Sequence, residues 1–426
     1  MNRRQFVSSS FQAAAAVGLA PQASASAQRI EQARQAALDL LKPSKAQIGH
    51  ALELHASSIV MESYGFAPRC AVDGAALRTA LEEGASDLEI QDLHEEMIMT
   101  RCVESPKEKE EFLNAWRAAG MTAIFQNAGE EGQNPQQLVK RLARFTYAAD
   151  MLRDHVFKAV TPEDIVAAKK QGKHCFYFSG NGVPLAQQWV SLPHELGYIR
   201  VFYQLGIRMM HLTYNRRNML GDGCAEPANA GLSDLGRAAI GEMNRVGVIV
   251  DVAHSGWQTS LEAAKASRMP MVASHSGCVA MNRHIRCKPD EVIRAIVDTG
   301  GFVGICCIPA FLGRSRDIVA FLDHIDYVVK RWGADHVAIG TDIAYSSAYS
   351  AEEWKKVGPR PKSRPRFESF WPPGALGGGP SHPSLSWTNW PIFTVGMVQR
   401  GYSDTNIQKI LAGNVLRVAR AALGRR

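Results

Sequence analysis

Short apolar runs rich in β-branched residues recur along the chain and alternate with segments of amphipathic helical pattern. Eight such runs occur, at 58–63, 121–127, 175–180, 208–214, 247–253, 270–275, 301–307 and 336–342. The clearest amphipathic stretches between them span 234–246, 257–267, 289–299 and 317–332. Near-continuous apolar strands that alternate with helices are typical of a parallel sheet covered on both faces. The pattern therefore predicts an α/β fold of the (β/α)8 TIM-barrel type.

An open, doubly wound sheet is the competing architecture. That fold would favour a nucleotide crevice, but no G-x-G-x-x-G motif follows any of the eight apolar runs. The barrel is therefore placed at 58–426, preceded by a helical segment at 28–57. A long basic stretch rich in Pro and Gly follows the eighth run, at 355–390. It is interpreted as a lid over the barrel mouth, a dimer contact or a disordered loop.

The first 27 residues have the pattern of an export signal. Arg3 and Arg4 precede a mildly apolar, Ala-rich stretch at 11–20, and Ala25-Ser26-Ala27 fits a cleavage site of small residues. Paired arginines before a weakly apolar core indicate the twin-arginine route. The pattern predicts a periplasmic or secreted protein.

Composition narrows the function classes. The 426 residues are 46% hydrophobic and carry a formal charge of +7, which favours anionic ligands over nucleic acid. No run reaches the roughly 18–20 apolar residues that a membrane-spanning helix needs. Eight cysteines are too sparse for a disulfide scaffold, so most are expected to be buried thiols, and any disulfide pairing stays open.

Two neighbouring strands of the predicted barrel each lead into a histidine. His254 follows "VIVDVA" and His275 follows "MVAS". A single histidine at a strand end is usually structural, but the carboxyl ends of barrel strands converge on one mouth. Asp342 ends the eighth predicted strand. Two imidazoles and a carboxylate form a hydrolytic zinc donor set, so His254, His275 and Asp342 are the predicted metal ligands.

Several segments of the chain resemble the membrane dipeptidase (renal dipeptidase) family of metallopeptidases, from about residue 50 to the C-terminus. The resemblance is densest in "LGIRMMHLTYNRRN", "GLSDLGRAAIGEMNRVGVIVDVAHSG", "VASHSGCVAMNRHIRCKPDE", "HVAIGTD" and "RGYSDTNIQKILAGNVLRV". It implies a (β/α)8 barrel, usually dimeric, in which two zinc ions share a bridging carboxylate and hydrolyse dipeptides. By motif, His254 and His275 match the histidines of one zinc site. Asp342 matches an aspartate that binds the other zinc and transfers protons, and Arg286 matches an arginine that holds the substrate carboxylate.

The chain also departs from the family pattern. Tyr64 and Phe66 stand where the resemblance implies an HxD ligand pair, and Ser179 stands where it implies the bridging glutamate. Tyr214 replaces a histidine that steadies the tetrahedral intermediate, so it is interpreted as an oxyanion donor or a packed rim tyrosine. These departures predict one zinc ion per chain.

The third zinc ligand stays open at this point. Asp342 is one candidate, either as ligand or as general base. Asp222, Cys224 and Glu226 are others, in a segment (218–227) that also reads as a turn built on glycines. Arg286 is the predicted substrate anchor, although it could instead brace a neighbouring carboxylate. The leading hypothesis is an exported metal-dependent hydrolase of dipeptides or similar small carboxylate-bearing amides. The alternative is a diverged barrel that has lost this activity.

Overall fold

The computed structural model describes residues 25–129, 133–313, 315–358, 365–377 and 380–423. The predicted export signal lies outside these residues except for Ala25–Ala27, which open the first described helix. Parts of the 355–390 segment, including Arg360, Lys362 and Arg364, also lie outside them.

Eight parallel strands form a nearly closed barrel, as predicted. Their order is β1-β2-β4-β5-β6-β7-β9-β10, and two short strands lie off this path, β3 beside β4 and β8 beside β7. The two ends of the order meet where the Asp342 amide donates to the Tyr64 carbonyl at 3.4 Å. The strands are β1 (Met61–Gly65), β2 (Ala123–Asn127), β3 (Val156–Ala159), β4 (His174–Gly180), β5 (Ile207–His211), β6 (Ile249–Asp251), β7 (Val272–Cys278), β8 (Cys287–Lys288), β9 (Phe302–Ile305) and β10 (Val337–Ile339).

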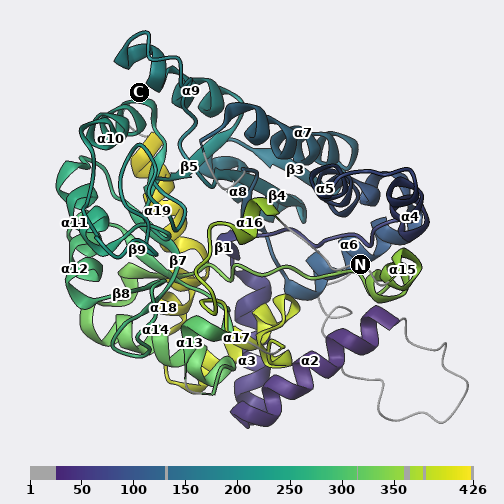
Figure 1. Cartoon of the computed structure of the whole chain (residues 1–426). Helices are drawn as coiled ribbons and strands as arrows, with labels where there is room; N and C mark the ends of the chain where they lie inside the picture. Colours follow the sequence, from purple (N-terminus) through teal and green to yellow (C-terminus); the bar gives the residue numbers. More distant parts are fainter. Residues whose placement is uncertain (1–24, 130–132, 314, 359–364, 378–379, 424–426) are drawn as a thin grey trace, which may run out of the picture.

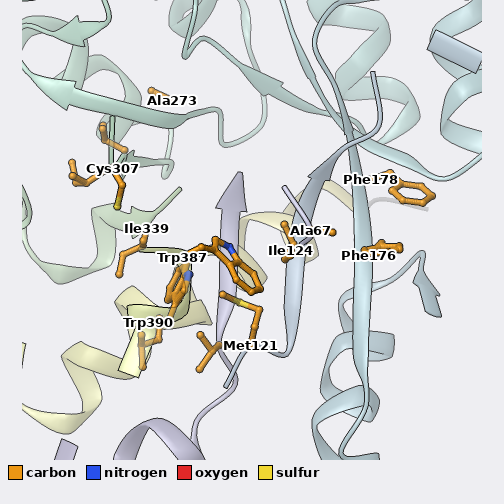
Figure 2. Close-up of a cluster of buried hydrophobic side chains, with 14 of the residues drawn as sticks. Ala67, Met121, Ile124, Phe176, Phe178, Ala273, Cys307, Ile339, Trp387 and Trp390 are labelled. Atoms are coloured by element: carbon orange, nitrogen blue, oxygen red, sulfur yellow. The ribbon is translucent and has the colours of Figure 1, made fainter. Parts of the chain in front are cut away.

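Alternate residues of each strand enter two different buried clusters. Phe125 and Tyr177 belong to a cluster inside the barrel, whereas their neighbours Ile124 and Phe176 belong to the layer between sheet and helices. Figure 2 shows part of this outer layer, where Trp387 and Trp390 lie beside the strand residues. Because both strand faces are buried, the runs read as continuously apolar. Val415 and Leu416 of the last helix join the inner cluster, so this helix closes the amino end of the barrel.

Helices surround the barrel on its outer face (Figure 1). Ser233 caps the start of α10 by accepting from the Gly236 amide, and Gly247 ends it with a φ of 94°, which a residue without Cβ adopts readily. The helices are α2 (Ala25–Leu41), α3 (Lys45–Ser57), α4 (Gly74–Glu82), α5 (Asp87–Glu104), α6 (Pro106–Ala119), α7 (Pro135–Met151), α8 (Pro162–Gln171), α9 (Leu192–Gln204), α10 (Asp234–Val246), α11 (Trp257–Ala266), α12 (Asp290–Asp298), α13 (Pro309–Leu312), α14 (Ile318–Trp332), α15 (Ser350–Val357), α16 (Pro365–Glu368), α17 (Trp390–Gln399), α18 (Asp404–Gln408) and α19 (Asn414–Leu423).

The helical segment before the barrel packs on its side. Helix α3 lies against α17, and α2 lies against the short helix η2 (Pro383–Leu385); the purple and yellow-green helices meet in Figure 1. Among the described helices, none has the length and apolar character needed to span a bilayer. All eight cysteines carry free thiols, and Cys224 is the one that is partly exposed.

Candidate functional site

The two predicted histidines meet at the carboxyl end of the barrel. His275 lies in β7 and His254 follows β6, and their Nε2 atoms are 3.0 Å apart. Both side chains are buried, at 0% and 2% exposure. The expectation that these strand ends converge is therefore met, while the role of the residues as ligands stays a prediction.

Hydrogen bonds on the far side of each ring fix its orientation. Nδ1 of His254 lies 2.7 Å from Oδ1 of Asn215, which can only accept, so this nitrogen carries the proton. Nδ1 of His275 lies 2.8 Å from Oγ of Ser274. The Ser274 hydroxyl donates to the Asp251 carboxylate, so Nδ1 of His275 is the donor here. Each Nε2 atom therefore carries a lone pair, and hydrogen bonds on the far side of the ring are typical of metal-binding histidines, although Nε2 of His254 also accepts from Nη2 of Arg286 at 3.1 Å.

A third imidazole, which sequence reasoning missed, completes the group. His211 ends β5, and its ring centroid is 5.3 Å from those of His254 and His275. Its Nε2 lies 2.8 Å from Oδ2 of Asp251. Within the described residues, His211, Asp251 and His275 form the one group of three metal-ligating side chains whose ligand atoms lie within 4.8 Å of one another. The polar Asp251 inside an apolar strand was the signal in the sequence.

Arg286 lies beneath the histidine pair. It is fully buried, and its Nη2 donates to Nε2 of His254 and to the His275 carbonyl, each at 3.1 Å. Nη1 donates to the Ala253 carbonyl. Lys288 is also fully buried nearby, where its Nζ donates to the Ser255 carbonyl at 2.7 Å and burial lowers its pKa to about 7.

Burial and the neighbouring cations keep His254 and His275 neutral. Burial, followed by the Arg286 guanidinium, holds the pKa of His254 and that of His275 well below the usual range. Asp251 retains its charge, since the His211 ring and the Ser274 hydroxyl outweigh burial and lower its pKa. The site therefore offers two neutral imidazole nitrogens and one carboxylate, the protonation states that metal binding requires.

Two tyrosines separate the histidines from a cavity. The ring of Tyr64 stacks on His275 at 3.9 Å, and that of Tyr214 stacks on His254 at 4.0 Å. Both tyrosines line a cavity of about 410 Å³ together with Asn181, and the Tyr64 hydroxyl donates to Oδ1 of Asn181 at 2.5 Å.

Asp342, the third predicted ligand, lines the same cavity, and its role as a ligand stays a prediction. Its φ of 58° places it in the left-handed region, which turns the chain at the end of β10. The Glu62 carboxyl holds this turn by accepting from the amide and hydroxyl of Thr341. Burial raises the pKa of Glu62 to about 8, so it is a neutral hydrogen-bonding group at pH 7.

The far wall of the cavity is mainly apolar and aromatic, with one accessible arginine. Arg69 lines it and lies 4.7 Å from the ring of Phe66. The segment after α16 contributes Trp371, whose ring lies 6.1 Å from His254 and 6.3 Å from Phe311. Trp371 of the 355–390 segment therefore lies close to His254, and the interpretation of the segment as a lid stays a prediction. The other wall residues are Ala67, Pro68, His94, Glu95, Ile98, Met99, Phe112, Asn127, Arg141, Phe145, Phe176, Ile308, Ile343, Ala344, Phe367 and Leu376.

The polar side chains of the loop at 218–227 form hydrogen bonds with nearby residues of the chain. Arg217 donates to Asp222 at 2.6 Å, and the Glu226 carboxylate accepts from the Arg217 amide at 3.1 Å. Cys224 donates its thiol proton to Oδ1 of Asn215 at 3.2 Å, so it lies behind His254. These contacts favour a turn over a set of metal ligands in this loop.

Comparison with known proteins agrees with this architecture. The family described as Membrane dipeptidase (Peptidase family M19) matches residues 80–361. "Dipeptidase tcpJ" of Claviceps purpurea (strain 20.1) is 26% identical over 75% of this chain and 64% of its own length. "Dipeptidase verJ" of Clonostachys rogersoniana is 28% identical over 52% of this chain. The chain thus spans 64% and 50% of the lengths of these two relatives.

Solved structures show the same fold. An amidohydrolase from Pseudomonas aeruginosa is 26% identical, with a TM-score of 0.66 over 88% of this chain and 99% of that one. The probable dipeptidase PvdM from the same organism is 20% identical, with a TM-score of 0.64 over 90% of this chain and 100% of that one. Since the family match covers more than half of the sequence, this chain belongs to the membrane dipeptidase family, peptidase family M19.

Proposed function

We propose that this protein is a metal-dependent hydrolase that cleaves the amide bond of dipeptides or similar small carboxylate-bearing amides. One observation carries the proposal. The Nε2 atoms of His254 and His275 face each other at 3.0 Å, and both rings are oriented from behind. Neutral imidazoles arranged in this way bind one zinc ion, the metal of hydrolytic sites with histidine and carboxylate ligands.

The residues present fit one ion and not two. Tyr64 and Phe66 supply no ligand pair at the end of β1, and the hydroxyl of Ser179 on β4 donates to the Gln126 carbonyl at 3.3 Å. The stacked ring of Tyr64 also covers the side of His275 that faces β1. The proposal is therefore one zinc ion per chain.

The cavity residues have separate roles in the proposed reaction. A bound zinc ion supplies Lewis-acid polarisation of the amide carbonyl and acidifies water. Asp342 lines the cavity and is suited to accept a proton from water and return it to the leaving amine. Tyr214 lies between the cavity and His254, where its hydroxyl can donate to a developing oxyanion. Trp371 and Phe367 cover the cavity and exclude bulk water.

Two arginines are candidates for binding the substrate carboxylate. Arg286 has this role by resemblance to the family, and a guanidinium pairs with a carboxylate through two parallel hydrogen bonds. Arg69 has it by position, because it lines the cavity while Arg286 does not. The two assignments predict different effects of arginine substitutions on the free energy of unfolding.

Metal content and turnover of the purified protein test the proposal. Wild type should hold about one zinc per chain and release amino acids from a dipeptide panel. His254→Ala and His275→Ala should each abolish bound metal, because a tetrahedral site that loses one protein ligand is destroyed. Asp342→Asn should keep the fold and lose most turnover. Unchanged metal content in both histidine variants would exclude the histidine pair as the site.

One observation favours a second function. The Arg286 guanidinium already donates to Nε2 of His254, the atom that a metal would need. A barrel that has lost hydrolysis and binds a small ligand in the cavity would retain this contact. Metal-free protein that turns over no dipeptide but binds one in calorimetry would support this alternative.

We further infer that the protein is exported, because the paired Arg3 and Arg4 precede an Ala-x-Ala sequence at 25–27. Cleavage after Ala27 would shorten α2 by its first three residues. Expression of the full chain, followed by N-terminal sequencing of the periplasmic fraction, tests this inference. Replacing both arginines with lysine should leave the precursor in the cytoplasm. A homodimer is also proposed from the resemblance, and sedimentation analysis tests it.

A further inference from the structure

Three imidazoles and one carboxylate surround a single point in the barrel. The ring centroids of His211, His254 and His275 are 5.0 to 5.3 Å apart. The Asp251 carboxylate lies 2.8 Å from Nε2 of His211. His211, Asp251 and His275 are fully buried, so water does not compete for them.

The topology of the barrel brings these residues together. Strands β5, β6 and β7 are adjacent, and His211 is directly paired with Asp251 in the register of β5 and β6. Two residues earlier on each strand, Met209 and Ile249 belong to the cluster inside the barrel. Because strand side chains alternate between faces, His211 and Asp251 form the next inward-facing layer, towards the mouth.

The imidazole of His211 has one polar neighbour, the Asp251 carboxylate. Its Nε2 lies 2.8 Å from Oδ2 of Asp251, whereas no hydrogen bond of suitable geometry reaches its Nδ1 among the described residues. A buried polar group without a partner costs about 1–3 kcal/mol. Asp251 is held firmly by the amides of Ala253 and Ser274 at 2.9 and 3.0 Å, so its Oδ2 is oriented towards His211. The ligand atoms of His211, Asp251 and His275 lie within 4.8 Å of one another, close enough for one ion to engage all three.

We propose that His211, Asp251 and His275 bind the divalent metal ion of this protein next to His254, and that three protein ligands leave one position of a tetrahedral ion for water or substrate. This inference rests on the proposed metal-dependent function and names the missing ligands. Two imidazoles and a carboxylate at these positions are the donor set that zinc prefers. Ligand atoms on a tetrahedral zinc lie about 3.3 Å apart, from bond lengths of about 2.0–2.1 Å. The observed separations of 2.8 and 3.0 Å need to widen by only a few tenths of an ångström.

This proposal places the metal ion at a different position from a site that includes Asp342. An ion bound by Asp342 would lie at the cavity wall, whereas an ion bound by His211 and Asp251 lies among β5, β6 and β7. The ligands lost from β1 and β4 are thus replaced by ligands from β5 and β6. Tyr64 then occupies the space beside His275 without excluding the ion.

Metal binding by matched variants tests this assignment. Purified full-length wild type, His211→Asn, Asp251→Asn and Asp342→Asn are dialysed against Zn²⁺ or Co²⁺, and bound metal is measured by mass spectrometry. Metal affinity should fall at least tenfold in His211→Asn and Asp251→Asn and stay within about twofold in Asp342→Asn. Visible absorption of the Co²⁺ form reports the coordination geometry and should change only in the first two variants.

X-ray absorption spectroscopy of the wild-type Zn²⁺ form provides a measurement that does not depend on variant folding. It should show at least two imidazoles and one oxygen ligand. Wild-type affinity in folded His211→Asn and Asp251→Asn, or loss of metal in Asp342→Asn, would overturn this assignment while leaving the proposed hydrolase in place. Wild type that binds no ion would overturn both. Metal bound through His211 without dipeptide turnover would support the assignment and count against the hydrolase.

Discussion

The phenol ring of Tyr64 lies flat on the imidazole of His275, with centroids 3.9 Å apart and ring planes inclined by 15°. The resemblance to dipeptidases implies a metal ligand at position 64, where this chain has a stacked aromatic ring. The Tyr64 hydroxyl donates to Asn181, which fixes the ring in this position. Ser179, two residues before Asn181, occupies the position of the implied bridging glutamate.

Restoring the first-strand ligands alone should not restore a second metal site. Tyr64→His with Phe66→Asp supplies two ligands but no bridging carboxylate, so we expect about one zinc per chain, as in wild type. Adding Ser179→Glu should raise the content to about two, because Ser179 is buried near the end of β4, two strands from β1 in the barrel. Metal analysis after dialysis measures both. A second tightly bound ion in the double variant would show that the bridge is dispensable.

Replacing Glu62 by Gln should lower the free energy of unfolding far less than replacing it by Ala. Its pKa of about 8 makes it a neutral acid at pH 7, and it bonds Thr341 and the Trp387 indole. Glu62→Gln retains an oxygen acceptor and should cost less than about 1 kcal/mol of unfolding free energy. Glu62→Ala leaves three buried donors unpaired and should cost about 3 kcal/mol or more. Urea denaturation at pH 7 compares them, and equal losses would mean that these bonds do not stabilise the Asp342 turn.

The eight barrel strands and the helices α10, α11, α12 and α14 could be predicted because each has a strong periodic pattern bounded by Gly or polar residues. Strands β3 and β8 could not, since four and two residues carry no measurable alternation. The convergence of His254 and His275 could be predicted from the barrel fold, because the carboxyl ends of barrel strands meet at one mouth.

The position of His211 in the site could not be predicted, for a different reason. It lies within an apolar run, and which residues of a strand face the barrel interior depends on a register that one sequence does not fix. The orientation of Arg286 also escaped prediction, because it depends on carbonyl groups of two other strand ends. These features arise from tertiary contacts, and only the polar Asp251 gave a local signal.

His55 should make the fold sensitive to mild acid. Burial lowers its pKa from 6.5 to about 4, while its ring bonds Thr394 and the Ala119 carbonyl. A base whose pKa is depressed in the folded state stabilises the fold fully above pH 6.5, and this stability is lost as pH falls towards 4. Between pH 8 and pH 5 the loss from this residue is about 2 kcal/mol. In His55→Gln the pH dependence of urea unfolding should be smaller by that amount; an unchanged slope would mean that the ring titrates normally.

Arg286 should be mainly a structural residue, and Arg69 the contact for a substrate carboxylate. Arg286 satisfies the carbonyls of Ala253 and His275 and bonds His254, all in the buried layer beneath the cavity. Arg286→Ala should therefore lower the unfolding free energy by about 3 kcal/mol or more, since two buried acceptors lose their donor. Arg286→Lys should recover part of this loss, because one ammonium cannot reproduce the planar fork.

The decisive comparison uses a dipeptide with a free carboxylate and its carboxamide. Wild type should prefer the acid by roughly 1–3 kcal/mol in kcat/KM, the usual worth of a charged hydrogen bond. Arg69 lines the cavity, so Arg69→Ala should remove most of this preference. Folded Arg286→Lys should keep the preference while losing stability. If instead Arg286→Lys abolishes the preference and Arg69→Ala retains it, the anchor implied by the family resemblance is correct, and the guanidinium must leave His254 when substrate binds.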